Sequence, residues 1–150
     1  MSTSFRIDPA TGSVLFDGTE AAVLNNASKD SIAAALSKHL KSVQDLGNGY
    51  EWLYFHDLSF GGKPATISVC FFQGKVRELR WNTNLRPNAA DNSWPTRDEC
   101  NKEIEFVLGV LRSSLSRRLS NGSEKFPWGL VWCEYNERDG FASSGLRYAN

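Results

Sequence analysis

The sequence predicts an α+β fold: an antiparallel sheet in the order ββ-α-βββ-α-ββ, with two helices packed on one face. Two segments have apolar residues at spacings of three and four, as helices do, and several short segments alternate apolar and polar residues, as strands do. The connections between these strands are short and rich in glycine, which favours antiparallel neighbours. The length of 150 residues fits a single α+β domain over residues 1–150.

The first predicted elements are a hairpin and a helix. Residues 5–8 and 13–17 have strand composition on either side of a Pro-Ala-Thr-Gly turn. Residues 28–46 carry apolar side chains at spacings of four and three, which predicts one helix. We expect Ser28 or Asp30 to cap it and Gly47 to end it. Its predicted buried stripe is Ile32, Leu36, Leu40 and Val43.

Three strands are predicted next, at residues 50–58, 65–72 and 75–83. Two adjacent glycines lie in the first connection and a Gln-Gly pair forms the second, so these strands should pair antiparallel. Residues 84–95, rich in Asn, Pro and Ala, are predicted to form a polar loop.

The second predicted helix begins with a capping box, in which the Thr96 hydroxyl and the Glu99 carboxylate satisfy free backbone amides. Acidic residues near its start and arginines near its end suit the helix dipole, which explains these charges structurally. Asn121-Gly122 is the predicted end. The predicted buried stripe is Cys100, Ile104, Val107, Leu108, Leu111, Leu115 and Leu119.

A hairpin rich in aromatic residues is predicted at the end of the chain. Residues 126–129 lead into it, 130–135 and 141–148 are its strands, and 136–140 its turn. Because successive side chains of a strand point to opposite faces, the predicted strands divide into an inward and an outward set. The inward set is Leu53, Phe55, Ile67, Val69, Phe71, Leu79, Trp81, Val131, Cys133, Tyr135, Leu146 and Tyr148.

The outward set is polar yet rich in Tyr, Trp and Arg, which are residue types enriched where proteins recognise proteins. Aromatic ladders also stabilise sheets without a partner, and the first hairpin or a second copy of the chain could cover this face, so these alternatives stay open. Our candidate partner-binding residues are Tyr54, His56, Arg80, Trp132, Glu134 and Arg147 on this face, with Arg138 at the hairpin tip.

Composition limits the function classes. Lysine and arginine number 17 together, as do aspartate and glutamate, so no basic field is available to collect phosphates and we predict no nucleic-acid partner. No apolar run reaches the roughly 18 residues of a membrane span, and the N-terminus lacks the features of a signal peptide. We therefore predict a cytoplasmic protein without a membrane partner, whose three cysteines are reduced and buried.

Little in the sequence indicates catalysis. His39 and His56 have no Cys or His at metal-ligand spacing, so we predict no metal and no cofactor. The fold could still assemble a nucleophile from Cys70 or Cys133 with His56, but a buried structural cysteine is the simpler interpretation. We therefore expect a protein that is not an enzyme.

Several segments carry a resemblance to a known group of proteins: GSVLFDG near the start, the block from NGYEWLYF to VRELRW, the helix entry around Trp94, and the final WGLVWCEYNERDGFASSGLRY. In their pattern and order they resemble small bacterial immunity proteins. Those proteins are encoded beside secreted or contact-delivered toxins and neutralise them in the cytoplasm. The resemblance implies binding of one cognate toxin, at its active site or an adjacent exosite. It implies no site residues, because the group shares no common motif.

Two further interpretations remain beside a toxin-binding immunity protein. A secretion chaperone or adaptor would have a similar element order and would bind an extended effector segment along a groove or strand edge. Many such chaperones are markedly acidic, which this chain is not. The third interpretation is a small enzyme built on Cys70 or Cys133 with His56. The predicted partner is thus a cognate toxin or effector protein, and homodimer formation is left open.

Overall fold

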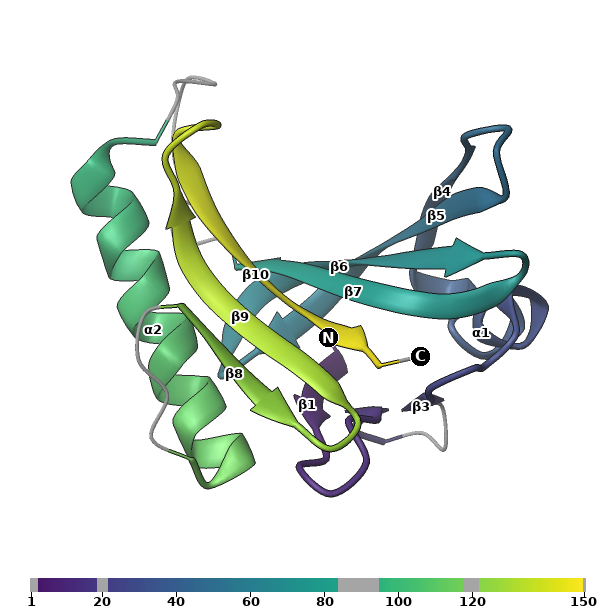
Figure 1. Cartoon of the computed structure of the whole chain (residues 1–150), viewed down its shortest axis with the longest axis horizontal. Helices are drawn as coiled ribbons and strands as arrows, with labels where there is room; N and C mark the ends of the chain where they lie inside the picture. Colours follow the sequence, from purple (N-terminus) through teal and green to yellow (C-terminus); the bar gives the residue numbers. More distant parts are fainter. Residues whose placement is uncertain (1–2, 19–21, 84–94, 118–121, 150) are drawn as a thin grey trace.

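The fold was analysed in a computed structural model, which describes residues 3–18, 22–83, 95–117 and 122–149 (Figure 1). The α+β class is confirmed, although the sheet has ten strands among these residues and therefore dominates the fold. The elements are β1 (Thr3–Ile7), β2 (Val14–Phe16), β3 (Ala22–Val23), α1 (Lys29–Ala35), η1 (Ser37–His39, a 3₁₀ turn), β4 (Leu40–Asp45), β5 (Tyr50–Phe60), β6 (Lys63–Phe72), β7 (Lys75–Thr83), α2 (Arg97–Leu115), β8 (Gly122–Phe126), β9 (Gly129–Asn136) and β10 (Phe141–Tyr148).

The central meander of β5, β6 and β7 forms as predicted. Phe60 pairs with Lys63 and Phe72 with Lys75, so each connection is a two-residue turn. All four turn residues have positive φ, which is the conformation that a tight hairpin turn of this hand requires. The glycines and the Gln-Gly pair in the sequence therefore mark these turns correctly.

The prediction of a single long helix over residues 28–46 is wrong beyond the first two turns. Ser28 does cap a helix, since its hydroxyl oxygen accepts a hydrogen bond from the Ser31 amide at 3.2 Å. However, α1 ends at Ala35, and the following residues form β4, an antiparallel partner of β5. Val43, placed in the predicted buried stripe, is consequently 51% exposed.

The glycines after β4 explain this difference. Gly47 and Gly49 both have positive φ and lie in the turn that joins β4 to β5. The Leu46 amide donates to the Tyr50 carbonyl oxygen at 3.0 Å and closes the hairpin. Gly47 is thus a hairpin residue and not a helix end, and the ladder with β5 outweighs local helix propensity.

The α2 helix confirms the predicted start and most of the predicted stripe. Thr96 and Glu99 form the capping box, with amide–oxygen distances of 3.0 and 3.1 Å. The helix ends earlier than predicted, because Ser116 adopts a left-handed conformation and Gly122 begins β8. Leu119 and residues 84–94 of the predicted loop lie outside the described residues. The buried residues of α2 are Cys100, Ile104, Val107, Leu108, Leu111 and Leu115.

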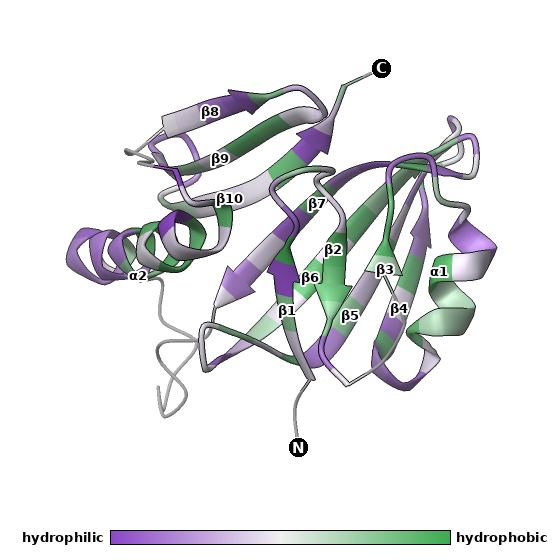
Figure 2. Ribbon diagram, turned by 90° about the horizontal axis from the view of Figure 1, so that it is seen from below, coloured by the Kyte–Doolittle hydropathy of each residue, from purple (hydrophilic) through white to green (hydrophobic). Residues whose placement is uncertain are grey.

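The strands follow the order β3-β2-β1-β5-β6-β7-β10-β9-β8, with β4 also paired to β5. The described strands pair antiparallel except for β1 with β5, so the prediction of a purely antiparallel sheet is wrong at this contact. Both helices contribute side chains to one core, but they lie at opposite ends of the molecule (Figure 2). Strands β1, β2 and β3 lie between the helices, and the predicted order ββ-α-βββ-α-ββ lacks three of the observed strands, β3, β4 and β8.

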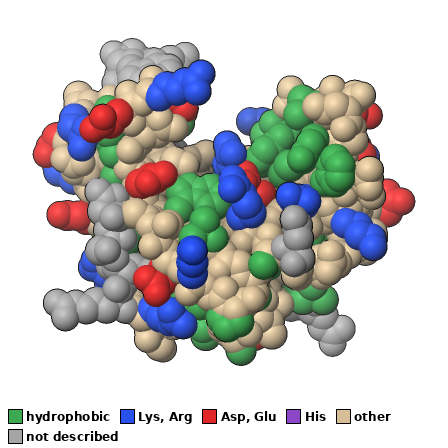
Figure 3. Space-filling model, in the orientation of Figure 1, with side chains coloured by type: hydrophobic (Ala, Val, Ile, Leu, Met, Phe, Trp, Pro, Cys, Tyr) green, Lys and Arg blue, Asp and Glu red, His purple; other side chains and the backbone are tan. Residues whose placement is uncertain are grey.

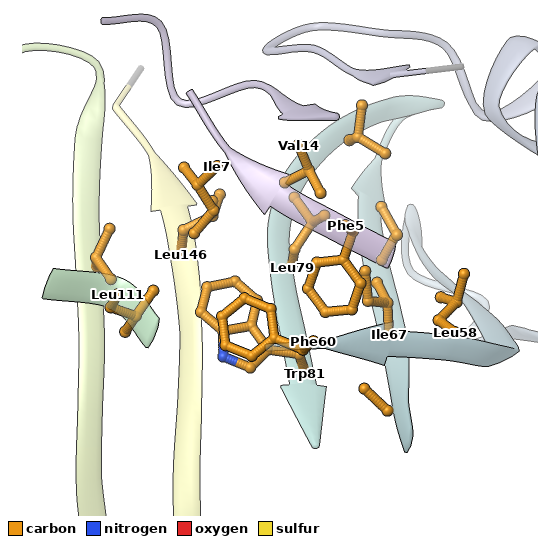
Figure 4. Close-up of a cluster of buried hydrophobic side chains, with 14 of the residues drawn as sticks. Phe5, Ile7, Val14, Leu58, Phe60, Ile67, Leu79, Trp81, Leu111 and Leu146 are labelled. Atoms are coloured by element: carbon orange, nitrogen blue, oxygen red, sulfur yellow. The ribbon is translucent and has the colours of Figure 1, made fainter. Parts of the chain in front are cut away.

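The core lies between the meander and the layer made by β1–β3 and α2 (Figure 4). Phe60 stacks on Phe5 with ring centres 4.8 Å apart and packs against Trp81 at 5.8 Å. The predicted inward set is buried as expected except for Tyr135, which is half-buried against the core. Strand phase therefore identifies the core side of the sheet correctly.

Gly145 on β10 provides a test of how tightly the strands pack. A β-carbon there would lie 2.3 Å from the Leu79 carbonyl oxygen and 2.7 Å from the Trp132 ring, whereas one at Gly109 on α2 would meet nothing. We expect Gly145→Ala to lower the free energy of unfolding by about 2 kcal/mol through overpacking. Gly109→Ala should raise it by about 0.5–1 kcal/mol through helix propensity. Urea unfolding measures both, and an unchanged Gly145→Ala midpoint would contradict the packing described.

Glu103 on α2 provides a pH-dependent test. Burial raises the pKa of its carboxyl from the ordinary 4.5 to about 7. The folded state then holds a proton that the unfolded state has lost, so stability falls as pH rises through this interval. We expect Glu103→Gln to stabilise the protein at pH 8 by about 1–2 kcal/mol and to have little effect at pH 4. The exposed Glu105→Gln is the control, and equal effects at both pH values would contradict the prediction.

Candidate functional site

The candidate site is the face of β5, β6, β7, β10 and β9 that points away from the core, which we call the outer face. In Figure 1 the β9–β10 hairpin rises at one side of this face and the β4–β5 hairpin at the other. Figure 3 shows the notch between these two raised ends, with hydrophobic and basic side chains gathered around it. One row across the sheet, set by the strand register, contains Tyr54, Ser68, Arg80, Gly145 and Trp132.

A buried carboxylate organises the centre of the outer face. Glu78, only 6% exposed, accepts a hydrogen bond from Arg80 Nε at 2.7 Å. Its other oxygen accepts from Arg147 Nε at 2.8 Å and lies 2.7 Å from Arg147 Nη2. The two arginine side chains are themselves about half exposed. One buried negative charge thus holds two guanidinium groups whose outer parts face solvent.

Aromatic rings fix the same two arginines from the side. The Arg80 guanidinium lies 5.2 Å from the centre of the Trp52 ring, and that of Arg147 lies 5.9 Å from the Trp132 ring. Trp132 is 9% exposed, lies over Gly145, and donates its indole N–H to the Ser143 hydroxyl at 3.0 Å. Trp132 therefore supports Arg147 and offers little surface of its own.

A hollow of about 370 Å³ opens beside this cluster. Tyr54 stacks near Trp52 at 6.4 Å, and its hydroxyl donates to Gln44 Oε1 at 2.8 Å. The exposed Phe141 ring of β10 contributes to the opposite wall. The hollow is lined by Trp52, Tyr54, Ser68, Arg80, Trp81, Asn82, Phe141, Ala142, Ser143 and Ser144. Its walls combine aromatic area with hydrogen-bonding groups, as protein-recognition surfaces do.

The structure brings together four of the seven candidate residues and leaves three apart. Arg80, Arg147 and Trp132 belong to the cluster around Glu78, and Tyr54 and Arg80 line the hollow beside it. The other three candidates are His56, which is half-buried, and Glu134 and Arg138, which are exposed.

His56 borders a second depression, of about 950 Å³, with His39 and Thr66. Its Nδ1 lies 3.6 Å from an Asp57 carboxylate oxygen, and its carbonyl oxygen lies 3.0 Å from His39 Nδ1. Glu134, opposite Ser143, is exposed on β9, while Arg138 is exposed in the following turn. These three residues extend the surface away from its centre.

The cluster consists of Glu78, Arg80, Arg147, Trp52 and Trp132, and two of these residues, Trp52 and Glu78, were not selected as candidates from the sequence. Trp52 and Glu78 belong to the outward set by strand phase, but nothing in the sequence shows that Glu78 lies between two arginines. Arg147 comes within reach only because β10 pairs with β7 in the register that sets Arg147 opposite Glu78. Gln44, the partner of Tyr54, was hidden by the prediction of a helix there. Only the assignment of residues 40–45 to a strand, in place of a helix, would have placed Gln44 beside Tyr54.

The cysteines lie in surroundings unsuited to nucleophilic catalysis. Burial raises the pKa of Cys133 to about 12, and its thiol faces the Ile104 carbonyl oxygen at 3.8 Å. Burial also raises the pKa of Cys70. Cys70 lies opposite Trp52 on β5, four residues along that strand from His56, so the two side chains are not neighbours. Within the described ranges, no group of three His, Cys, Asp or Glu side chains is placed to hold a metal ion.

Comparison with known proteins gives one result in structure and none in sequence. No family model matches the chain, and no curated protein matches its sequence. Its fold is similar to that of a chain in the solved structure described as "Rhs1-CT in complex with cognate immunity protein RhsI1". The TM-score is 0.55 at 9% identity, over 96% of this chain and 86% of that chain. The resemblance to immunity proteins is confirmed at the level of the fold.

At this sequence identity the likeness concerns the fold alone, and no residue of the outer face is carried over from it. Among the helices that the structure describes, none is long and apolar enough to cross a membrane. The fold likeness and the outer face are therefore the two observations on which a function can be proposed.

The Glu78 cluster predicts that its two arginines are coupled. Arg80→Ala or Arg147→Ala alone leaves the carboxylate one partner and should cost about 1 kcal/mol of unfolding free energy. The double variant leaves a buried charge unpaired and should cost about 3 kcal/mol or more, beyond additivity. Arg6→Ala, which removes an exposed pair with Asp17, is the control with almost no effect. Strict additivity in urea unfolding would show that the cluster does not act as a unit.

Proposed function

We propose that this chain is a cytoplasmic immunity protein, which binds and neutralises a cognate bacterial toxin by protein–protein contact and without catalysis. The observation that carries the proposal is the outer face, where Glu78 and two tryptophans hold Arg80 and Arg147 in place. The fold likeness supports it, because the solved structure is that of a toxin C-terminal region with its cognate immunity protein.

The arrangement of the arginines suits tight binding. A free arginine loses considerable side-chain entropy when a partner immobilises it, but these two are held in position before any partner arrives. Arg80 uses only its Nε on Glu78, so its Nη groups have no hydrogen-bond partner among the described residues. These groups would donate to a carboxylate or a carbonyl oxygen of the toxin, while Tyr54 and Trp52 supply aromatic contact area.

Charge reversal at Arg80 tests the proposed contact. We expect Arg80→Glu to weaken the complex with the toxin encoded beside this gene by roughly a hundredfold or more, mostly through faster dissociation. Tyr54→Ala should weaken it roughly tenfold. Arg6→Glu is the matched control, because it reverses an exposed, ion-paired arginine on β1, outside the outer face. Surface plasmon resonance with folded variants makes the comparison, and retained affinity in both test variants would exclude the outer face as the contact.

A protection assay tests the function itself. Cells that express the toxin should survive when the wild-type chain is co-expressed, and Cys70→Ala and Cys133→Ala should each protect them equally well. A neighbouring product that is harmless alone and forms no stable complex would contradict the immunity function. Loss of protection in Cys70→Ala or Cys133→Ala with unchanged binding would instead indicate catalysis. Binding of a short extended segment of the partner alone would favour a secretion chaperone.

A further inference from the structure

At one end of the molecule, β4 pairs with β5 and has no strand partner on its other edge among the described residues (Figure 1). All five residues from Lys41 to Asp45 are exposed. Two of the large exposed hydrophobic side chains, Val43 and Leu46 at 51% and 46%, lie on this strand and its turn. An exposed edge with an apolar side chain at its centre favours the addition of another strand.

The other two ends of the described sheet are less available. At one end, β3 consists of two residues and offers little backbone for pairing. At the other end, Arg117 extends over β8, donating to the Lys125 carbonyl oxygen at 3.3 Å and to Glu124 at 2.9 Å. Both are arrangements that protect an edge from a second strand. The register of β4 with β5 is irregular at Lys41, which gives this edge some protection, but the regular residues from Ser42 to Asp45 are all exposed, so β4 is the most accessible of the described edges.

The sequence of β4 is complementary to itself. When two copies run antiparallel about Val43, the two Val43 residues face each other and Ser42 of one copy faces Gln44 of the other. Lys41 of each copy, at the irregularity of β4, is then nearest Asp45 of the other, so its long side chain forms two opposite-charge pairs by symmetry. We propose that this chain forms a two-fold symmetric homodimer through its β4 edges, joining two sheets into one.

This inference concerns a second surface and does not depend on the toxin. Glu78 and its two arginines lie on β7 and β10, so the dimer leaves them open in both copies. Because one pair of short strands buries little surface, the dimer should be weak, with a dissociation constant in the micromolar range. Each dimer would present two outer faces.

Charge reversal on β4 tests the dimer. Wild-type protein should shift from monomer to dimer in sedimentation velocity over a roughly hundredfold rise in concentration. Lys41→Asp and Asp45→Lys alone each set like charges opposite one another and should be monomeric at concentrations where the wild type is dimeric. An equimolar mixture of the two variants restores both opposite-charge pairs and should form dimers. The exposed Lys38→Asp, just outside β4, is the control and should behave as wild type.

Three results would overturn the proposal: a wild-type protein monomeric throughout, single variants as dimeric as wild type, or a mixture that stays monomeric. Circular dichroism and urea unfolding check that the variants are folded. A monomeric wild type whose β4 variants lose toxin affinity would assign this edge to a toxin strand, which also overturns the homodimer. Unchanged dimerisation in Arg80→Glu keeps this test separate from that of toxin binding.

Discussion

The β5 strand changes partner half-way along its length, and the core depends on this change. Its first half pairs with β4, and after the irregularity at His56 and Asp57 its second half pairs with β1. Asp57 has positive φ, which costs on the order of 1 kcal/mol in a residue other than glycine. Beyond this irregularity, Phe60 stacks on Phe5. Burial of each ring stabilises the fold by roughly 2–3 kcal/mol, so the two rings together outweigh the cost of the Asp57 conformation.

The core in turn determines the rigidity of the outer face. Leu79 and Trp81 are fully enclosed on β7, so Arg80 between them must point outward at a fixed position. Leu146 fixes Arg147 on β10 in the same way. Glu78 then links the two strands across the sheet, since it contacts an arginine from each. A surface built on alternating positions of packed strands has few conformations to lose on binding.

Two surfaces of the molecule therefore have different physical characters. The outer face is organised by internal ion pairs and aromatic rings, and offers side-chain donors in fixed positions. The β4 edge offers backbone groups and a short pattern of opposite charges around Val43. Side-chain recognition of the first kind suits a single cognate partner, and strand pairing of the second kind suits a second copy of the chain. Because they lie on different strands, the two contacts are compatible.

The sequence by itself determined those elements whose signals are local. The capping box of α2, the two-residue turns of the meander and the inward phase of its strands all follow from residues within a few positions of one another. The conformation of residues 40–45 does not follow from local signals, because their apolar spacing also fits a helix. Their hydrogen-bonded pairing with β5 makes them a strand.

Tertiary structure also decided the parallel contact of β1 with β5 and the position of Glu78. Glu78 and Arg147 are 69 residues apart, and their meeting depends on the register between β7 and β10. Strand phase could place both residues on one face, yet it holds no information on which residues of distant strands are opposite. The candidate residues were thus predictable as a set, whereas the cluster that fixes them arises only from the pairing of strands remote in sequence.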